Sequence, residues 1–241
     1  MDLNYIFSDA IRYPFRDYKK LLILGLLLIF TELGSIYLVY GSGNIAIYLV
    51  ACVIGLIFGI YVAGYSISVM NKGTEYSDDV PEFDLHKNFI DGFKTFIISI
   101  IYFIIPTIIL IVAAILFAGI SALLSSLQIA IILFIILFVI AIIAYILFAI
   151  NEAVALARFA YYDDWTEALS FSSVYEDTKE IGAKNIILFI IMMLIIFMLI
   201  LAISAIIDLI PYVGLLISCI IVKSFATLFY ARAIGLFYSE K

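Results

Sequence analysis

The chain has 241 residues, of which 66% are hydrophobic and only 13% charged, and its formal net charge is -6. Soluble proteins contain about 45–50% apolar residues, so a water-soluble fold is excluded and lipid is the expected solvent. An acidic chain also lacks the surplus of Lys and Arg with which proteins bind nucleic acid. We predict an all-α membrane protein that forms a single integral membrane domain over residues 1–241.

The N-terminal segment mixes charged and apolar residues and does not resemble the start of a cleavable signal peptide. Leu3, Phe7 and Ala10 recur at helical spacing, and Asp9 and Arg12 lie on the other face. This pattern predicts an amphipathic helix that lies in the cytoplasmic interface ahead of the first span.

Six stretches reach the length of about 20 apolar residues that a helix needs to cross the hydrocarbon core of a membrane. Small and polar residues separate them, as in the turn-forming "GSGN" at 41–44. We therefore predict six transmembrane helices, arranged as three helical hairpins. The spans run from Pro14 or Leu21 to Tyr40, from Ile45 to Met70, as two helices within Thr95–Asn151 that divide at Gly119–Gln128, from Ile186 to Ile207, and from Pro211 to Tyr238.

Amphipathic segments also precede the second and third hairpins. Leu85, Phe89 and Phe93 form one apolar stripe at helical spacing. Asp164 and Glu167 match a capping box at the start of the third segment. Each hairpin is thus predicted to follow a cytoplasmic, interfacial amphipathic helix.

The three hairpins share further features that indicate an internal repeat. An acid followed closely by a lysine opens each one, in "DYK" at Asp17, "DGFK" at Asp91 and "EIGAK" at Glu180. The returning helices end in "VAGYSISVM", "AVALARFAYY" and "FYARAIGLFY". We predict a pseudo-threefold arrangement of three repeats, over residues 1–75, 80–163 and 164–241.

Basic residues flank the predicted spans on one side only, and the three loops on the opposite side contain no Lys or Arg. By the positive-inside rule, both termini are predicted to be cytoplasmic in a multi-pass protein of the cell membrane. The flanking basic residues are Arg12, Arg16, Lys19, Lys20, Lys72, Lys87, Lys94, Arg158, Lys179, Lys184, Arg232 and Lys241.

Four stretches carry a resemblance to a known family: "DAIRYPFRDYKKLLILGLLL", "VPEFDLHKNFIDGFKTFIISIIYFIIPTII", "AVALARFAYYDDWTEALSF" and "SFATLFYARAIGLFYSE". They resemble the membrane-protein family called domain of unknown function 4013, found largely in methanogenic archaea and in some bacteria. The resemblance covers nearly the whole chain and implies a polytopic membrane architecture. The family has no established activity, so the resemblance implies no catalytic residues.

The candidate intramembrane ionisable residues are Glu32, Glu152, Asp208 and Lys223, whereas Arg232 is assigned to the cytoplasmic end of its span. A charge at mid-helix costs about 2.5–3.5 kcal/mol on insertion scales, so such residues are candidate functional residues. Asp208 precedes Pro211 and is interpreted as an interfacial helix-end residue. Glu32 and Lys223 lie at comparable depth, roughly 13–18 Å from the basic residues that flank their spans. We predict that Lys223 pairs with Glu32 or, alternatively, with Glu152.

The predicted pair has two interpretations. It is either a structural clasp between the first and last spans or the lining of a cavity for an ion, a proton or an amphiphile.

Two further features of the sequence concern the packing and shape of the helices. Gly55, Gly59 and Ala63 recur every four residues, as in close helix pairs, and Pro106 is predicted to kink the third span.

The sequence contains no recognisable catalytic or metal-binding constellation. His86 is the single histidine, which argues against His-based metal sites and Ser–His catalysis. Cys52 and Cys219 lie in apolar runs and are interpreted as small hydrophobic residues. The acidic loop "EYSDDVPEFD" lacks the spacing of a calcium loop and is predicted to be solvated. We expect no cofactor, no metal and no enzymatic activity.

Three classes of function remain, of which an enzyme acting at the interface has no catalytic residues to support it. The intramembrane charges and Pro106 favour binding or transport of an amphiphile, an ion or a small solute within the helix bundle. The amphipathic helices and packing faces fit a non-catalytic scaffold or partner subunit of a membrane complex. The expected partners are membrane lipid and either another membrane protein or a second copy of the chain, and not nucleic acid.

Overall fold

A computed structural model describes residues 2–123, 127–210 and 213–241, and these residues form helices and no strands. The predicted all-α fold is therefore confirmed. In chain order the helices are α1 (Leu3–Arg12), the 3-10 helix η1 (Tyr13–Phe15), α2 (Tyr18–Thr31), α3 (Leu33–Tyr40), α4 (Ile45–Thr74), α5 (Leu85–Leu123), α6 (Leu127–Tyr162), α7 (Trp165–Ala168), α8 (Phe171–Ile181), α9 (Ala183–Ile207), α10 (Val213–Ile217), the π-helix η2 (Ser218–Lys223) and α11 (Ser224–Ser239).

Within the described residues, five helical runs are long and apolar enough to cross a membrane: α4, α5, α6, α9 and the run Val213–Ser239. A sixth results if α2 and α3 are taken together, although their axes differ by 55°. These five or six helices fit a multi-pass membrane protein. The predicted divisions at Gly119–Gln128 and Pro211 fall partly on residues 124–126 and 211–212, which lie outside the described residues.

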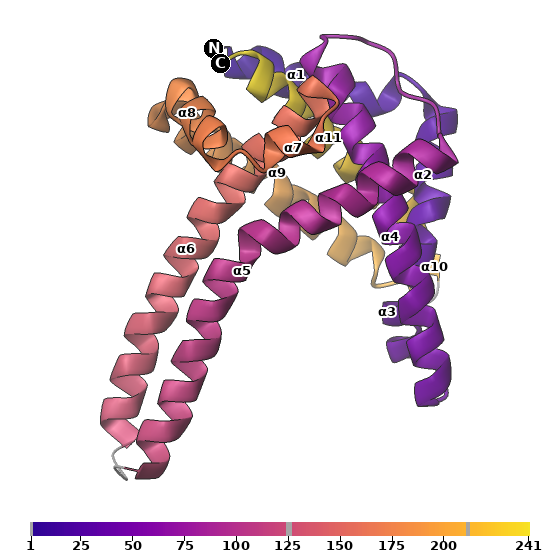
Figure 1. Cartoon of the computed structure of the whole chain (residues 1–241). Helices are drawn as coiled ribbons and strands as arrows, with labels where there is room; N and C mark the ends of the chain where they lie inside the picture. The colour runs from indigo at the N-terminus through magenta and orange to yellow at the C-terminus, as the bar shows by residue number, and fades with distance from the viewer. Residues whose placement is uncertain (1, 124–126, 211–212) are drawn as a thin grey trace.

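The second amphipathic segment is not a separate helix, in contrast to the prediction. α5 begins at Leu85 and continues for 39 residues, so it contains both this segment and the third span. Gly92 alone does not stop the helix, because a helical glycine costs only about 1 kcal/mol. Figure 1 shows that α5 crosses the molecule and then changes direction, and Pro106 lies inside it. The third amphipathic segment is divided into α7 and α8.

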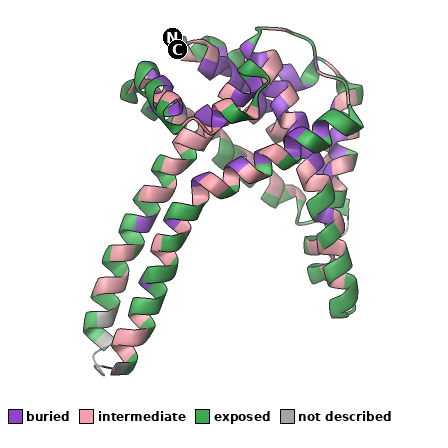
Figure 2. Cartoon of the chain, viewed as in Figure 1, coloured by how far each residue is buried: buried purple, intermediate pink, exposed green. Residues whose placement is uncertain are grey.

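Both termini lie together at one end of the molecule, here called the capped end, which comprises α1, α7, α8 and the loop 75–84 (Figure 1). The α5–α6 and α2–α4 hairpins leave it as two separate legs. Figure 2 shows buried residues gathered at the capped end and exposed residues along the legs. Ile6 of α1 and Ala168 of α7 are 0% exposed, whereas Leu38 of α3 and Ile115 of α5 are 69% and 64% exposed. Legs with so much exposed apolar surface fit a surrounding of lipid.

The small residues of α4 differ in what they face. At Gly55, a Cβ atom would lie 2.9 Å from the backbone oxygen of Thr31, so the two helices approach closely there. At Gly59, nothing lies within 4 Å of the Cβ position. Ala63 is half-buried. The predicted packing face is therefore in close contact at Gly55 and open at Gly59.

Another pair of glycines, which the sequence analysis did not select, lies at the crossing of α4 and α5. A Cβ atom at Gly64 would overlap the backbone oxygen of Asn88, and one at Gly92 would overlap that of Ile60. The two backbones can therefore touch only because both positions lack a side chain.

Candidate intramembrane charge site

Glu32 lies at the joint between α2 and α3. Its backbone leaves helical geometry (φ -93°, ψ 4°), and its amide donates to Ile29 as well as to Phe30 instead of to the residue four positions back. The Thr31 hydroxyl donates to the Leu28 oxygen at 2.7 Å. In a regular α-helix this oxygen would accept from the Glu32 amide. The first candidate span is thus interrupted at its only charged residue between Leu21 and Tyr40.

Lys223 is the last residue of the π-helix η2, at which the final run departs from α-helical geometry. A π-turn places backbone carbonyls out of register with the next amides, so hydroxyl groups bond to them. Ser224 donates to the Ile220 oxygen at 2.5 Å, and Thr227 donates to the Lys223 oxygen at 2.8 Å. Short π-segments of this kind are frequent at functional sites.

These two irregular segments meet. The Lys223 ammonium donates to Glu32 Oε1 at 2.6 Å, and the two side chains are 37% and 26% exposed. η2 packs against α2 at Gly25, where a Cβ atom would overlap the backbone of Ile220. We call Glu32 and Lys223 the charge site.

A cleft of about 500 Å³ opens beside Glu32, between the α2–α3 joint and α4. Ser35, Tyr48 and Cys52 supply polar or polarisable atoms to its wall. Gly59 also lines it, which accounts for the open space at that position. Within the described residues, no group of three or more His, Cys, Asp or Glu side chains is arranged to hold a metal ion.

Glu152 does not reach Lys223. Its Oε1 atom accepts a hydrogen bond of 2.5 Å from Ser99 on α5. Asp208 is exposed and follows the last residue of α9. Of the two pairs that the sequence left open, the structure therefore shows Lys223 with Glu32 and not Lys223 with Glu152.

Residues 47–209, more than half of the chain, match a family model described as "Protein of unknown function (DUF4013)". The chain belongs to this family. No curated protein and no solved structure matches it. The DUF4013 match contains Glu152, whereas Glu32 and Lys223 lie on either side of it.

Sequence reasoning on this DUF4013 member missed a fully buried arginine at the capped end. Arg232 on α11 is 0% exposed, and its Nε donates to Asp9 on α1 at 2.7 Å. Its Nη1 donates to the backbone oxygens of Lys72 and Ser77 at 2.8 and 2.6 Å. Its guanidinium also lies 4.7 Å from the centre of the Tyr13 ring. Arg232 therefore ties α1 and the loop 75–84 to the last helix.

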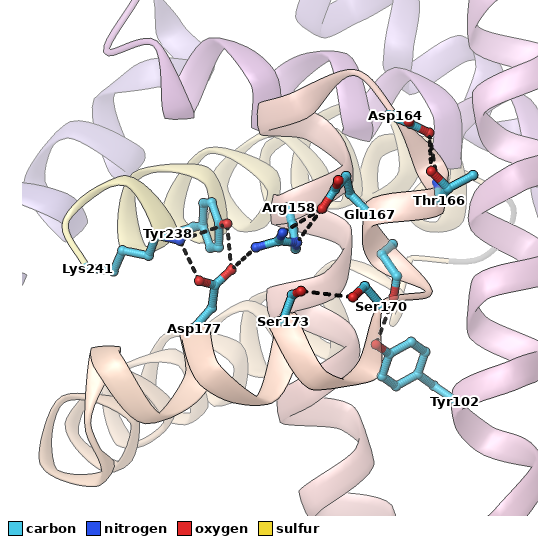
Figure 3. A network of polar contacts seen from close by, with 11 residues as sticks. Tyr102, Arg158, Asp164, Thr166, Glu167, Ser170, Ser173, Asp177, Tyr238 and Lys241 are labelled. Atoms are coloured by element: carbon cyan, nitrogen blue, oxygen red, sulfur yellow. Dashed lines mark hydrogen bonds and ion pairs between the residues drawn. The ribbon is translucent and has the colours of Figure 1, made fainter.

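A second arginine, Arg158 on α6, has a related position (Figure 3). It donates to Asp177 on α8 at 2.6 Å and to Glu167 on α7 at 2.5 and 3.1 Å. Tyr238 and Lys241 donate to the same Asp177 carboxylate at 2.8 and 2.6 Å. Burial acts to raise the pKa of Asp177, but the hydrogen bonds from Lys241, Tyr238 and Arg158 outweigh it and hold the pKa below its ordinary value.

Only half of the predicted capping box is present in this DUF4013 protein. Asp164 accepts from the Thr166 amide at 2.9 Å and caps α7. Glu167 bonds to Arg158 instead of to the capping residue. The Glu167 side chain therefore belongs to the hydrogen-bond network of Arg158 and not to a capping box. The sequence signal for the two buried arginines is that Arg158 and Arg232 occupy similar places in "ALARFAYY" and "FYARAIGLFY".

Proposed function

We propose that the protein binds a small ion or charged solute at the charge site and passes it across the membrane. The observation that carries the proposal is that both helices lose α-helical geometry at their charged residue, at the α2–α3 joint and in η2. Discontinuous helices at membrane depth are tolerated where they line a cavity, and transporters place binding sites at such breaks.

The charge site is also partly exposed, which supports a role in binding. Each side chain has the other as its charged partner and remains partly exposed. A structural pair at this depth is expected to be fully surrounded by hydrogen-bonding groups. An entering ion can therefore replace one partner without first dismantling a buried network.

We infer that the chain contains three repeats, and internal repeats are common in transporters. A polar side chain on the returning helix of each hairpin contacts the segment that precedes the next hairpin, and the third contacts the first. The pairs are Ser68 with Asn88 at 3.2 Å, Arg158 with Asp177 at 2.6 Å and Arg232 with Asp9 at 2.7 Å. This cyclic order is what a pseudo-threefold arrangement of hairpins requires.

We also propose that the capped end is cytoplasmic, because the basic residues that flank the spans gather there. Single cysteines at Ser42 and Asp79, in a variant without Cys52 and Cys219, test the orientation with an impermeant thiol reagent on intact cells. We expect labelling of the Ser42→Cys variant only. Labelling of Asp79→Cys from outside would reverse the orientation.

Transport is tested with purified protein in proteoliposomes on a solid-supported membrane, by recording charge movement after jumps of NaCl or KCl. We expect a transient current that the Lys223→Met/Glu32→Gln double variant loses while it remains folded. Arg12→Met is the matched control, because Arg12 is exposed and lies outside the charge site. A current that survives in the double variant, or that equals the current of empty liposomes, contradicts the proposal.

A second candidate function, a partner subunit of a membrane complex, is favoured by the α5–α6 leg. Its lipid-facing residues include Ile115, Ile132 and Leu147, which are 64%, 60% and 55% exposed. Crosslinking in native membranes from a photoreactive residue at position 132 tests this function. A discrete protein adduct supports a partner subunit, and lipid adducts alone contradict it.

A further inference from the structure

α5 carries a stripe of polar residues along one face. The residues recur every three or four positions, which places them on the same side of the helix. They are Asn88, Asp91, Thr95, Ser99 and Tyr102. Asn88, Asp91, Thr95 and Tyr102 are 1%, 4%, 8% and 1% exposed, so the stripe faces the protein and not lipid. We call these five residues the α5 stripe.

Glu152 of α6 meets the α5 stripe at Ser99. Among the described residues, the Ser99 hydroxyl is its hydrogen-bond partner and no cation pairs with it. The cations that could have done so are engaged elsewhere: Lys94 with Asp91 at 3.0 Å, Arg158 with Asp177 at 2.6 Å, and Lys223 with Glu32 at 2.6 Å. Glu152 is thus a carboxyl group within a candidate span that has one neutral partner.

A carboxylate without a cation is unfavourable at membrane depth, whereas a neutral carboxylic acid is tolerated. The same carboxyl loses its proton where water reaches it. A group with these two states takes up and releases a proton, which is how intramembrane carboxyls serve in proton relays. The ligand that suits a single carboxyl and a single hydroxyl is therefore a proton and not a metal ion, which needs more oxygen ligands.

The other end of the α5 stripe supplies a route toward the capped end. Asp91 is 4% exposed, and its Oδ2 atom is buried without a hydrogen-bond partner among the described residues. Buried polar atoms of this kind are normally satisfied, in many cases by water. Thr95 and Ser99 follow at four-residue steps of about 6 Å each, a spacing that one bridging water can span.

We propose that Glu152 is a proton-binding carboxyl that exchanges its proton with the capped end along Asp91, Thr95 and Ser99. Titratable and charged groups on the elements packed around this path are Tyr61 of α4, Asp91, Lys94 and Tyr102 of α5, Arg158 of α6, Glu167 of α7, Asp177 of α8 and Tyr238 of α11. This site belongs to a different hairpin from the charge site. Its failure would therefore leave the transport proposal untouched, and the reverse also holds.

The proton is detected by labelling with dicyclohexylcarbodiimide, an apolar reagent that reacts with protonated carboxyls inside membranes. The acid adds across a C=N bond of the reagent, and the adduct rearranges to a stable N-acylurea without a leaving group. Peptide mass spectrometry then locates the modified residue. The protein is labelled in liposomes between pH 6 and pH 9.

We expect labelling at Glu152 that falls about tenfold per pH unit once the carboxyl ionises. The ion-paired Glu32 serves as the internal control and should react at least tenfold less. Glu152→Gln should abolish the label without loss of folded yield, because the amide can still accept from Ser99. Equal labelling of Glu32 and Glu152, or an unlabelled Glu152 at every pH, overturns the assignment.

The route has a separate test, which uses infrared spectroscopy after a rapid pH jump. The carboxyl C=O band that Glu152→Gln removes reports on proton arrival in the otherwise native protein. Asp91→Asn and Thr95→Val should slow the rise of this band at least tenfold. Thr107→Val is the matched control, because Thr107 also lies on α5 but bonds to Tyr145 at 2.8 Å. An unchanged rate in both route variants shows that protons reach Glu152 by another path.

Discussion

Arg232 and Lys223 lie nine residues apart on the last helical run, and the two cations differ in exposure, in helix geometry and in their partners. Arg232 is 0% exposed, lies in regular α-helix and has several partners. Lys223 is 37% exposed, ends a π-helix and has Glu32 as its one charged partner among the described residues. The buried cation, which several partners hold, lies in a regular helix, whereas the partly exposed cation coincides with two distorted helices. The contrast separates a structural clamp from a candidate binding site.

Arg232 should be the residue whose loss damages the fold most. Arg232→Met removes a buried ion pair with Asp9, which keeps Arg16 as a partner, and two hydrogen bonds to the backbone oxygens of Lys72 and Ser77. We therefore expect a loss of about 3–5 kcal/mol in the free energy of unfolding. Arg232→Lys should recover little, because an ammonium cannot reproduce the forked geometry of the guanidinium. The measurement is the melting temperature and monodisperse yield in detergent. Arg12→Met, at an exposed position, is the control and should be neutral.

The comparison would break if Arg232→Met melted like the wild-type protein. In that case the network around Arg232 would not stabilise the fold more than the charge site does. The distinction between clamp and binding site would then rest on helix geometry alone.

The charge site should respond more weakly and with a different pattern. Lys223→Met and Glu32→Gln should each cost about 1–3 kcal/mol, less than a fully buried pair, because both side chains are partly exposed. The double variant should recover part of the loss, since neither charge is then left alone. Melting temperatures of the four proteins form a double-mutant cycle. Strictly additive losses would show that the two residues do not interact.

The sequence predicts the charge site better than it predicts the helix geometry around it. The depth of Glu32 and Lys223 follows from counting residues along each span, because helical rise is constant. The joint at Glu32 and the π-helix do not follow, because both depend on where side-chain hydroxyls bond to the backbone. Apolar periodicity carries no information about such bonds. The burial of Arg232 is equally invisible, since its partner Asp9 is 223 residues away in the chain.

The fold shows the same division. The long apolar runs predict the spans, since length and composition alone decide which helices can cross a membrane. The continuity of α5 from Leu85 was missed, because an amphipathic stripe followed by an apolar run looks the same whether or not the helix stops between them. The close crossing at Gly64 and Gly92 was missed because the two glycines belong to different helices and share no sequence spacing.

Gly25 sharpens the comparison, because it acts on the π-helix without touching a charge. Gly25→Ala would place a methyl group against the backbone of Ile220, and we expect a loss of about 1–2 kcal/mol through overpacking. Gly59→Ala is the matched control, since nothing lies within 4 Å there and alanine favours a helix. It should be neutral or slightly stabilising. Equal melting temperatures for the two variants would show that η2 does not depend on this contact.

The smallest effect is a pH dependence at the capped end. Because the pKa of Asp177 is depressed in the folded protein, its contribution to stability is fully present above the ordinary Asp value of about 3.9 and is lost as the pH falls through the folded value. Asp177→Asn should therefore lower the melting temperature at pH 7, and the difference from wild type should shrink between about pH 4 and pH 3. Glu176→Gln, an exposed change on the same helix, should show no such convergence. A difference for Asp177→Asn that stays constant down to pH 3 would mean that the carboxylate of Asp177 does not hold Arg158 and Lys241 by its charge.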